Sequence, residues 1–418
     1  MTTDSTLSGN DRGTSSRNSA FGGAAPADSA PNALAALVAP RQPPFGVNEM
    51  RLNAREWLAT LATVVIAVVA APRLWQRFEP LNADADYRLP YALSDDYWLY
   101  ERRLEQTAGA ARIPILGDSV VWGEYVRPDG TLSHFLDAQS SRSDRFVNCG
   151  INGLFPLALE GLIEHYGDAL RNRRVIVHCN LLWMTSPKAD LSTQKEEAFN
   201  HSRLVPQFYP RIPCYKAGAE TRLSAAIENH VAFFAWANHL QTAYYDQKSI
   251  ADWTLEEDGS EPPKYVNAWR NPLAPLAAGL PGEPANDPQR GPTSARHKPW
   301  NTGGAEPSPF EWVEPPDSLQ WQAFQRVVRI LKSRNDDVLV ILGPFNEHMI
   351  PAEQRPTFRN WQKTIVSWLA ENHVAAVVPD ALPSELYADA SHPLTQGYRL
   401  LASRLLETAE LRAWALER

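Results

Sequence analysis

The sequence predicts an α/β protein, with a three-layer α/β/α sandwich around a five-stranded parallel sheet and one N-terminal transmembrane helix. Five short apolar runs alternate with segments of helical periodicity, which is the pattern of parallel strands joined by helices. Ahead of these runs, an uncharged apolar stretch follows a long tail of small and polar residues. The alternation predicts the sandwich, and the apolar stretch predicts the membrane helix.

The N-terminal tail, residues 1–48, is rich in Ser, Ala, Gly, Pro and Asn and shows no apolar periodicity. A segment of this composition cannot bury enough apolar surface to offset the entropy lost on ordering. We therefore expect the tail to be disordered.

Residues 55–76 are the predicted membrane anchor. The stretch from Trp57 to Ala71 carries no charge, and arginines and tryptophans flank it. It is shorter than the ~20 residues that span a bilayer comfortably, so a buried core helix and a late signal peptide are alternatives. The long preceding tail argues against both. Arginines on both sides give a slight positive-inside bias, and we expect a cytoplasmic N-terminus with the folded domain outside the cytoplasm.

The folded domain is expected over residues 90–418. Ser94-Asp95-Asp96 can cap its first helix, and the first strand then runs to Gly117. That strand ends abruptly in Gly-Asp-Ser, which delivers the hydroxyl of Ser119 to the rim of the sheet. Because Gly, Asp and Ser all favour turns, a turn without catalytic function is the alternative.

The second and third strands end at the same rim. The second begins near Arg145 and leads to Gly153, whose backbone N–H can come close to a substrate because no side chain shields it. A helical pattern follows, with apolar residues at Leu159, Leu162, Ile163, Tyr166 and Leu170. The third strand begins at Val175 and ends at Asn180, whose side-chain amide can donate a hydrogen bond.

Residues 186–317 form a long insertion before the next strand. Asn229 to Tyr245 is predicted to be a helix that packs through one face, carrying Val231, Phe234, Ala235 and Asn238. Residues 261–310 are rich in Pro, Gly and small polar residues, which predicts a loop. Because the insertion leaves the sheet beside Asn180, we expect part of it to overhang the site and set substrate choice.

The fourth strand, Asp337 to Leu342, is followed by Asn346 and His348. These two side chains are predicted substrate contacts, because open α/β sheets bind ligands outside the carboxyl ends of their strands. A turn with solvated polar groups is the alternative. His348 could also compete for the role of a catalytic base, but no aspartate accompanies it nearby in the sequence.

The fifth strand, Val374 to Val378, precedes Asp389 and His392, which are three positions apart. A carboxylate and an imidazole at this spacing are candidates for acid–base chemistry. Alternatively, the segment only starts the closing helix, with Pro393 in the first helical position.

The order of these residues resembles the SGNH hydrolase superfamily, the GDSL-like esterases, whose sequence blocks carry Ser, Gly, Asn and His in that order. Ser119, Gly153 and Asn180 match the first three blocks, and Asp389 with His392 matches the last. The resemblance covers about residues 111–182 and 335–408.

The sequence departs from the family pattern in two places. His178-Cys179-Asn180-Leu181 stands where the third block usually has Gly-x-Asn-Asp, and Val120-Val121 replaces the usual leucine after the serine. In the family, the residue at Asp118 supports the loop rather than the chemistry, and we expect the same here.

The resemblance implies a flavodoxin-like sheet with strand order 2-1-3-4-5 and a serine esterase that works through an acyl-enzyme. Ser119 would be the nucleophile, His392 the base, and Asp389 the group that holds the imidazole tautomer. The oxyanion hole would consist of the N–H groups of Ser119 and Gly153 and the amide of Asn180.

Two other functions are open. Membrane-anchored relatives add or remove acyl groups on cell-surface polymers, so O-acyl transfer to a cell-envelope carbohydrate is the first. A non-catalytic domain that binds glycans or scaffolds an envelope complex is the second. In all three cases the partners are a membrane and an ester or carbohydrate.

Composition argues against other classes of protein. The net charge of −8 and the lack of a basic stripe argue against nucleic acid as a partner. No Cys or His pair has the spacing of metal ligands, so we expect no metal ion and no other cofactor. Given the implied strand order, Cys149 and Cys179 flank the first strand about 9–10 Å apart. That separation exceeds disulfide reach, about 7 Å between Cα atoms, and predicts free thiols.

Overall fold

The structure is a computed structural model that describes residues 52–81, 83–140, 145–256, 270–277, 279–280 and 297–416. The chain divides into two units, residues 1–60 and 61–418. The predicted tail, residues 1–48, lies outside the described residues, and so does most of the Pro-rich segment 261–310.

Helix α1 (Ala54–Phe78) is long and apolar enough to cross a membrane. Asn53 fixes its start, because its side-chain oxygen accepts the N–H groups of Arg55 and Glu56 at 3.0 Å. In return, the Asn53 N–H donates to Glu56 Oε2 at 2.7 Å, so the cap is reciprocal. Only 6% of the most apolar stretch of α1 is buried, which argues against a core helix. The helix lies where the anchor was predicted.

The second unit contains a five-stranded, all-parallel sheet in the order β2-β1-β3-β4-β5, which is the predicted order. Gly117 pairs with Gly150, and the Ile151 N–H donates to Gly117 O at 3.1 Å. Segments that follow β1 and β2 therefore leave the sheet at one edge. The strands are β1 (Ile113–Gly117), β2 (Phe146–Gly150), β3 (Arg174–Cys179), β4 (Asp337–Leu342) and β5 (Ala375–Val377).

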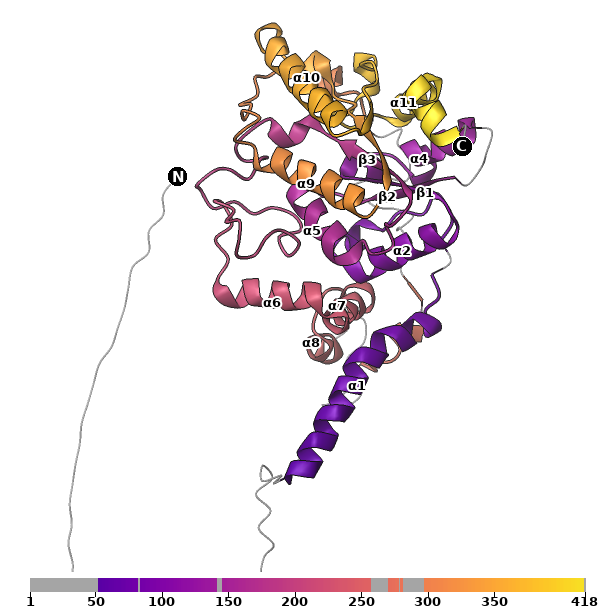
Figure 1. The fold of residues 1–418 in the computed structure, drawn as a ribbon, viewed down its shortest axis with the longest axis vertical. Coiled ribbons are helices and arrows are strands. Elements are labelled where there is room, and N and C mark those ends of the chain that lie inside the picture. The colour runs from indigo at the N-terminus through magenta and orange to yellow at the C-terminus, as the bar shows by residue number, and fades with distance from the viewer. Residues whose placement is uncertain are drawn as a thin grey trace, which may run out of the picture. The chain divides into compact units, whose positions relative to one another are not determined.

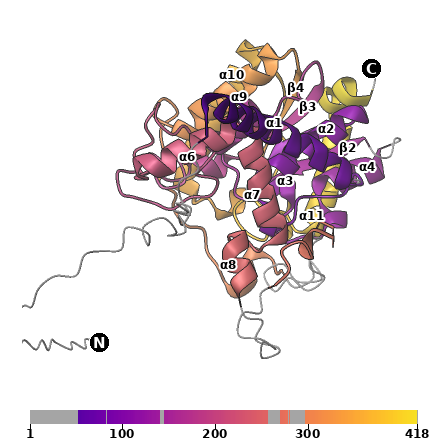
Figure 2. The same ribbon diagram turned by 90° about the horizontal axis from the view of Figure 1, so that it is seen from below.

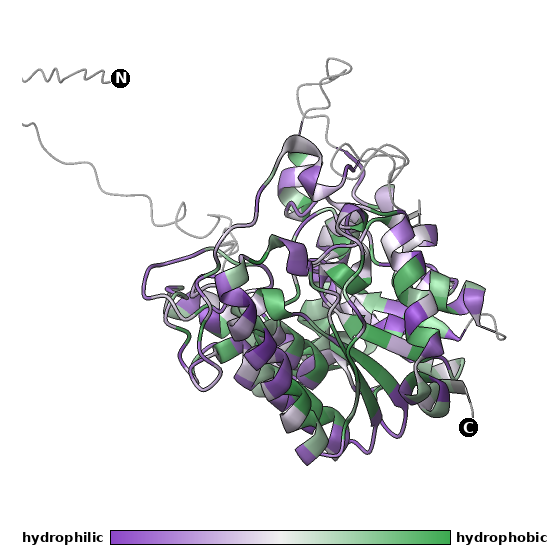
Figure 3. Cartoon of the chain, turned by 90° about the horizontal axis from the view of Figure 1, so that it is seen from above, coloured by the Kyte–Doolittle hydropathy of each residue, from purple (hydrophilic) through white to green (hydrophobic). Residues whose placement is uncertain are grey.

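Helices cover both faces of the sheet, with the apolar strands between them (Figures 1 and 3). Strand side chains alternate between the faces, so Val175 and Val177 join one apolar cluster and Ile176 joins the other. The first cluster includes residues of α2 (Tyr97–Gly109), α5 (Pro156–Tyr166), α9 (Leu319–Ser333) and α10 (Arg355–Glu371). The second includes residues of α3 (Ser119–Trp122), α4 (Leu132–Gln139), α11 (Thr395–Glu407) and α12 (Ala409–Leu411).

Short helical turns connect these layers. They are η2 (Tyr91–Leu93), η3 (Pro128–Gly130), η4 (Leu181–Met184), η5 (Pro275–Ala277), η7 (Trp300–Gly303), η8 (Glu347–Met349), η9 (Ala352–Gln354), η10 (Ser384–Leu386) and a final π-turn, η11 (Arg412–Leu416).

One predicted helix boundary was wrong, and one alternative interpretation does not hold. Helix α5 ends at Tyr166 with Gly167 as its cap, so Leu170 is buried in the following turn instead of on the helix. In the alternative interpretation of the segment around His392, Pro393 takes the first helical position, but α11 begins at Thr395. Pro393 pairs with Tyr387 in an isolated antiparallel bridge, and this pairing keeps it outside the helix.

The insertion carries α6 (Ala219–His230), α7 (Ala232–Tyr244) and α8 (Ile250–Leu255), which lie together, with α7 against α2 (Figures 1 and 2). The helix predicted from Asn229 to Tyr245 is divided, because Val231 is extended between α6 and α7. Its predicted packing face was right only in part, because Ala235 is buried but Phe234 is 46% exposed. His239, which the prediction left out, is fully buried and pairs with Asp96, the N-cap of α2.

The three cysteines, Cys149, Cys179 and Cys214, are free and buried, and free thiols had been predicted for the first two. Cys149 lies on β2 and Cys179 on β3, with β1 between them. Burial raises the pKa of the Cys149 thiol to about 11, so the group stays protonated at neutral pH. This thiol is a core residue, not a nucleophile.

Candidate active site

The turn after β1 places Ser119 at the carboxyl edge of the sheet. The chain passes from Gly117 through Asp118 into α3, whose first residue is Ser119. A Cβ on Gly117 would lie 2.5 Å from Val121 Cγ2, so this close approach requires glycine. Asp118 Oδ1 accepts the Val120 N–H at 3.0 Å and fixes the start of α3. The serine therefore stands in a tightly constrained turn.

Ser119, His392 and Asp389 form one hydrogen-bonded chain. Ser119 Oγ lies 2.8 Å from His392 Nε2. On the other side of the ring, His392 Nδ1 lies 2.8 Å from both carboxylate oxygens of Asp389. Only 8% of Ser119 and 6% of His392 are exposed. The three residues that the sequence predicted as a unit thus lie together, in the order that nucleophilic catalysis by serine requires.

The loop that carries His392 is held from two directions. Asp389 Oδ1 accepts the N–H groups of Ser391 and His392 at 2.9 Å. Asn346, which follows β4, donates its side-chain amide to Asp389 O at 3.0 Å and its own N–H to Ala390 O at 2.9 Å. The position of the imidazole is therefore fixed by the end of β4 as well as by its own loop.

The charges of the site favour an ionised aspartate beside a basic imidazole. Burial raises the pKa of Asp389, but the adjacent His392 outweighs it and leaves the pKa below its ordinary value. Burial lowers the pKa of His392, but Asp389 and then Glu124 outweigh it and leave this pKa above its ordinary value. The imidazole can therefore accept a proton more readily than an isolated histidine can.

Asp118 is the centre of a second hydrogen-bond network, directly beside the serine. Its Oδ2 accepts Asn180 Nδ2 at 3.0 Å and Trp183 Nε1 at 2.9 Å, and its Oδ1 lies 3.2 Å from His178 Nδ1. Burial raises the pKa of Asp118, but His178 and then Asn180 and His392 outweigh it and hold the pKa below its usual value. The carboxylate joins the ends of β1 and β3, which agrees with a supporting role. His178 and Trp183 had not been assigned to the site from sequence.

Asn180 and Gly153, the other predicted oxyanion donors, follow β3 and β2. Asn180 is fully buried, and its Oδ1 accepts the Leu182 N–H at 3.0 Å. One amide hydrogen goes to Asp118, and a carboxamide has two. Gly153 has a φ of +73°, and a Cβ there would lie 2.2 Å from Asn200 Nδ2, so glycine is required. The oxyanion role of these residues stays a prediction.

Asn346 and His348, the predicted substrate contacts, support loops in the structure. Asn346 has no exposed surface, and its amide nitrogen is bound to Asp389 O. His348 Nε2 lies 3.0 Å from Leu382 O. These bonds give both residues a positioning role, and contact with a substrate stays a prediction.

Two side chains beside His392, and a third that contacts one of them, were missed from sequence. Glu124 Oε2 lies 3.6 Å from His392 Nε2. The Tyr125 ring stands edge-on to the imidazole with centroids 5.4 Å apart, and it contacts the His297 ring at 4.8 Å. Glu124 and Tyr125 follow Ser119 closely, so proximity in the chain was a usable signal for them. His297 comes from the insertion, and nothing in its sequence context points to the site.

The end of the insertion therefore comes close to the site through Tyr125, and its predicted effect on substrate choice stays a prediction. Trp300 anchors it there, because its N–H donates to Tyr387 O at 2.9 Å and its Nε1 donates to Ser384 Oγ at 3.1 Å. Both partners lie on the segment between β5 and His392. This docking holds His297 beside Tyr125.

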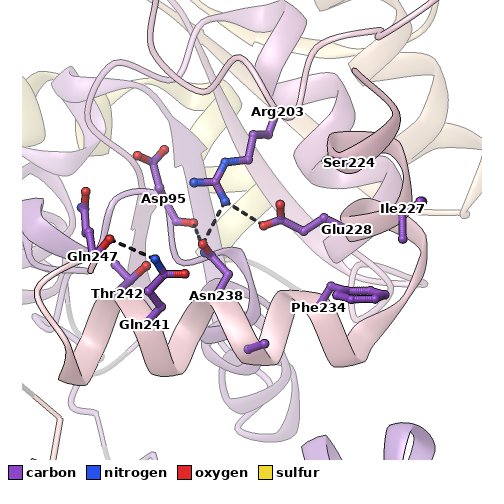
Figure 4. A pocket seen from close by; sticks show the side chains of 11 residues that line it. Asp95, Arg203, Ser224, Ile227, Glu228, Phe234, Asn238, Gln241, Thr242 and Gln247 are labelled. Carbon is purple, nitrogen blue, oxygen red and sulfur yellow. Dashed lines mark hydrogen bonds and ion pairs between the residues drawn. The ribbon is translucent and has the colours of Figure 1, made fainter. Parts of the chain in front are cut away.

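A separate cavity of about 500 Å³ lies between α6 and α7 (Figure 4). Arg203 Nη1 lies 2.8 Å from Glu228 Oε1 and 2.9 Å from Asn238 Oδ1 across it. Its charged groups thus satisfy one another, and no residue of the Ser-His-Asp unit is among its described lining. Within the described residues, no group of three or more His, Cys, Asp or Glu side chains is placed to hold a metal ion. The candidate site is therefore the one around Ser119.

No family model matches this chain, and no curated protein sequence matches it. A functional assignment therefore depends on the residues of the site and their geometry.

Proposed function

We propose that this protein is a membrane-anchored serine esterase of the SGNH hydrolase type, which cleaves an ester through an acyl-enzyme. The observation that carries the proposal is the hydrogen-bonded chain from Ser119 through His392 to Asp389, with 2.8 Å at each step. The strand order and the positions of Gly153 and Asn180 at the same sheet edge are what this family fold requires.

In the proposed reaction, Ser119 Oγ attacks the ester carbonyl while His392 Nε2 takes its proton. Asp389, which binds Nδ1, keeps the other ring nitrogen facing the serine and stabilises the imidazolium. Glu124 lies 3.6 Å from the same ring and adds to that stabilisation. His392 then gives the proton to the departing alcohol, and water releases the acid by the reverse sequence.

The carbonyl oxygen becomes an anion during the attack and needs hydrogen-bond donors. The backbone N–H groups of Ser119 and Gly153 and the second amide hydrogen of Asn180 would supply them. Each such donor contributes about 3 kcal/mol to lowering the barrier. Asp118 supports this arrangement because its Oδ2 accepts a hydrogen bond from Asn180 Nδ2 at 3.0 Å, which fixes the plane of the amide.

O-acyl transfer to a cell-envelope carbohydrate is the second candidate. Two observations favour it. Ser119 and His392 are 8% and 6% exposed, and a shielded acyl-enzyme is protected from water. Glu124 and Tyr125 also place polar groups beside the base, where a hydroxyl acceptor must bind. Adding glycans to an ester assay separates the two, because a transferase forms acylated glycan faster than free acid.

A fluorophosphonate probe tests the proposal on the full-length protein in detergent. The parent should be labelled covalently, and Ser119→Ala should not be labelled or hydrolyse a short-chain aryl ester. Ser391→Ala is the matched control, because it removes a buried hydroxyl one residue from His392 and leaves the backbone N–H to Asp389. An unlabelled parent, as a non-catalytic binding domain would give, refutes the proposal, and so does equal turnover by Ser119→Ala.

We also propose that α1 spans the membrane once, with a cytoplasmic N-terminus and the esterase domain outside the cytoplasm. The length and apolar character of the helix support the anchor. The orientation is supported by the slight positive-inside bias and by the common arrangement in which a large folded domain follows a first hydrophobic segment. Protease added to intact cells should reach the domain. Protection until lysis would show the opposite orientation.

A further inference from the structure

A cavity of about 350 Å³ lies beside the proposed oxyanion hole, between the loop after β2 and the first part of the insertion. Gly153 and Phe155 line it from the β2 side, and Ala158 lines it from α5. Ala189 and Leu191 line it from the insertion. Its volume falls in the range of small-molecule sites, about 300–1,000 Å³.

The lining is mainly apolar, and its two charged residues and Gln320 are already bonded. Lys188 Nζ at the rim lies 3.1 Å from Glu197 Oε2. Gln320 accepts the Leu157 N–H at 3.0 Å and donates to Ala189 O at 3.4 Å. With its charges paired in this way, the cavity suits an uncharged, apolar group.

The wall that the insertion contributes is firmly attached to the domain. Asp190, which lies between two lining residues, is fully buried and accepts the N–H groups of Leu319 and Gln320 at 3.1 Å. It thereby binds the insertion to the start of α9. The cavity is therefore a built site and not a gap between loosely placed loops.

Gly153 and a chain of side-chain contacts connect the cavity to the turn that carries the nucleophile. Phe155 contacts Trp183 with ring centroids 6.3 Å apart, and Trp183 Nε1 donates to Asp118, the residue before Ser119. Gly153 and Phe155 follow β2, which is at one edge of the sheet, whereas His392 comes after β5 at the other edge. An ester bound at Ser119 thus has the cavity on one side and the imidazole on the other.

This arrangement decides which half of the ester enters the cavity. The departing alcohol must lie next to His392, because that residue protonates it. The side chains there, Glu124 and Tyr125, are polar. The acyl group lies on the opposite side of the carbonyl carbon, which is the side of the apolar cavity.

We propose that this cavity binds the acyl chain, and that the substrates are esters of apolar acyl groups longer than acetyl; the inference rests on the proposed esterase function. The bond from Ser119 Oγ to the carbonyl carbon forms, and the bond from that carbon to the alcohol oxygen breaks. The serine proton passes through His392 to the alcohol. Water then adds to the carbonyl carbon, Ser119 leaves with its proton restored through His392, and the carboxylic acid is released.

The test measures kcat/KM of the full-length protein on 4-nitrophenyl acetate, butyrate, hexanoate and octanoate. Burial of one methylene changes a rate about fourfold, so the parent should prefer hexanoate over acetate by at least tenfold. Ala158→Leu fills the cavity and should remove that preference while acetate turnover changes less than about threefold. Leu191→Ala enlarges the cavity and should move the optimum to longer chains, which keeps the test decisive if Ala158→Leu does not fold.

Ile227→Ala is the control, because it removes a similar volume from the other cavity and should leave the chain-length profile unchanged. The inference is overturned if the protein hydrolyses esters through Ser119 but the parent shows no chain-length preference. It is also overturned if neither Ala158→Leu nor Leu191→Ala changes that preference. If instead no ester is cleaved and the fluorophosphonate does not label Ser119, the proposed esterase function itself has failed, and the inference falls with it.

Discussion

Replacement of Asn180 by alanine should lower kcat because it removes an oxyanion donor, and it should also lower the free energy of unfolding. The side chain performs two separable tasks in the proposed site. One amide hydrogen is bound to Asp118 Oδ2 at 3.0 Å, and the second is the proposed donor to the oxyanion. Since both tasks are lost together in Asn180→Ala, the structural part must be measured on its own.

Trp183→Phe provides that measurement. Its indole Nε1 donates to the same oxygen, Asp118 Oδ2, at 2.9 Å, and Trp183 is not an oxyanion donor in the proposal. Each variant removes one hydrogen bond to a buried carboxylate, which costs about 1.5–3 kcal/mol of unfolding free energy. Asn180→Ala also removes the acceptor of the Leu182 N–H, and Trp183→Phe also shrinks a fully buried side chain, so the two variants should lose similar stability.

Catalysis should separate the two variants. Loss of one oxyanion donor lowers kcat by about 10²–10³-fold, equivalent to about 2.7–4 kcal/mol in the barrier. We expect this fall for Asn180→Ala with little change in KM, and a fall of less than about tenfold for Trp183→Phe. Fluorophosphonate titration counts the competent serines, so that kcat is expressed per folded site. Equal losses of kcat in the two variants would show that Asn180 acts only by supporting Asp118.

Two further predictions concern titratable groups. Glu124 raises the pKa of His392, and the imidazole must be neutral to act as a base. Glu124→Gln should therefore move the acidic limb of the kcat/KM profile to lower pH, while plateau kcat falls no more than about fivefold. An acidic limb that does not move would contradict this. Burial lowers the pKa of His239, but Asp96 and then Glu79 outweigh it and raise this pKa to about 9. The stabilisation that protonated His239 contributes is therefore complete below pH ~6.5 and is lost as pH rises through about 9. In denaturant unfolding, His239→Gln should lower the free energy of unfolding by about 3–5 kcal/mol at pH 6 but by much less at pH 10. An equal loss at both pH values would contradict this.

The parts of the fold that follow from short-range pattern were predictable. An apolar run such as Val175 to Cys179 has one stable place, the middle of a parallel sheet, because both of its faces must be covered. Polar residues directly after such runs then meet at one edge. That reasoning predicted Ser119 and Asn180 at the same edge, whereas His392, 273 positions after the serine, was predicted beside them through the resemblance to the SGNH hydrolases.

The surroundings of the site were not predictable in this way, because they depend on contacts without a periodic signal. Asn346 was expected to face the substrate, but its amide binds Asp389 O, a backbone atom that no sequence pattern marks. His297 reaches Tyr125 only because Trp300 docks on the loop that leads to His392. Such placements depend on the path of a long insertion, and one residue of shift along that path would change them.

The buried ionic network on α7 shows why the insertion cannot be regarded as an appended segment. His239 Nδ1 lies 2.6 Å from Asp96 Oδ2 and its Nε2 lies 2.9 Å from Glu79 Oε2, while Arg102 also binds Glu79 at 3.0 Å. Without α7, the two carboxylates and the guanidinium would lose their buried partner, and that loss would destabilise α2, which packs on the sheet. The same insertion forms one wall of the apolar cavity and places His297 near the base. Deletion of the whole insertion would therefore unfold the domain, so the contribution of the insertion to specificity must be measured by substitutions in its walls.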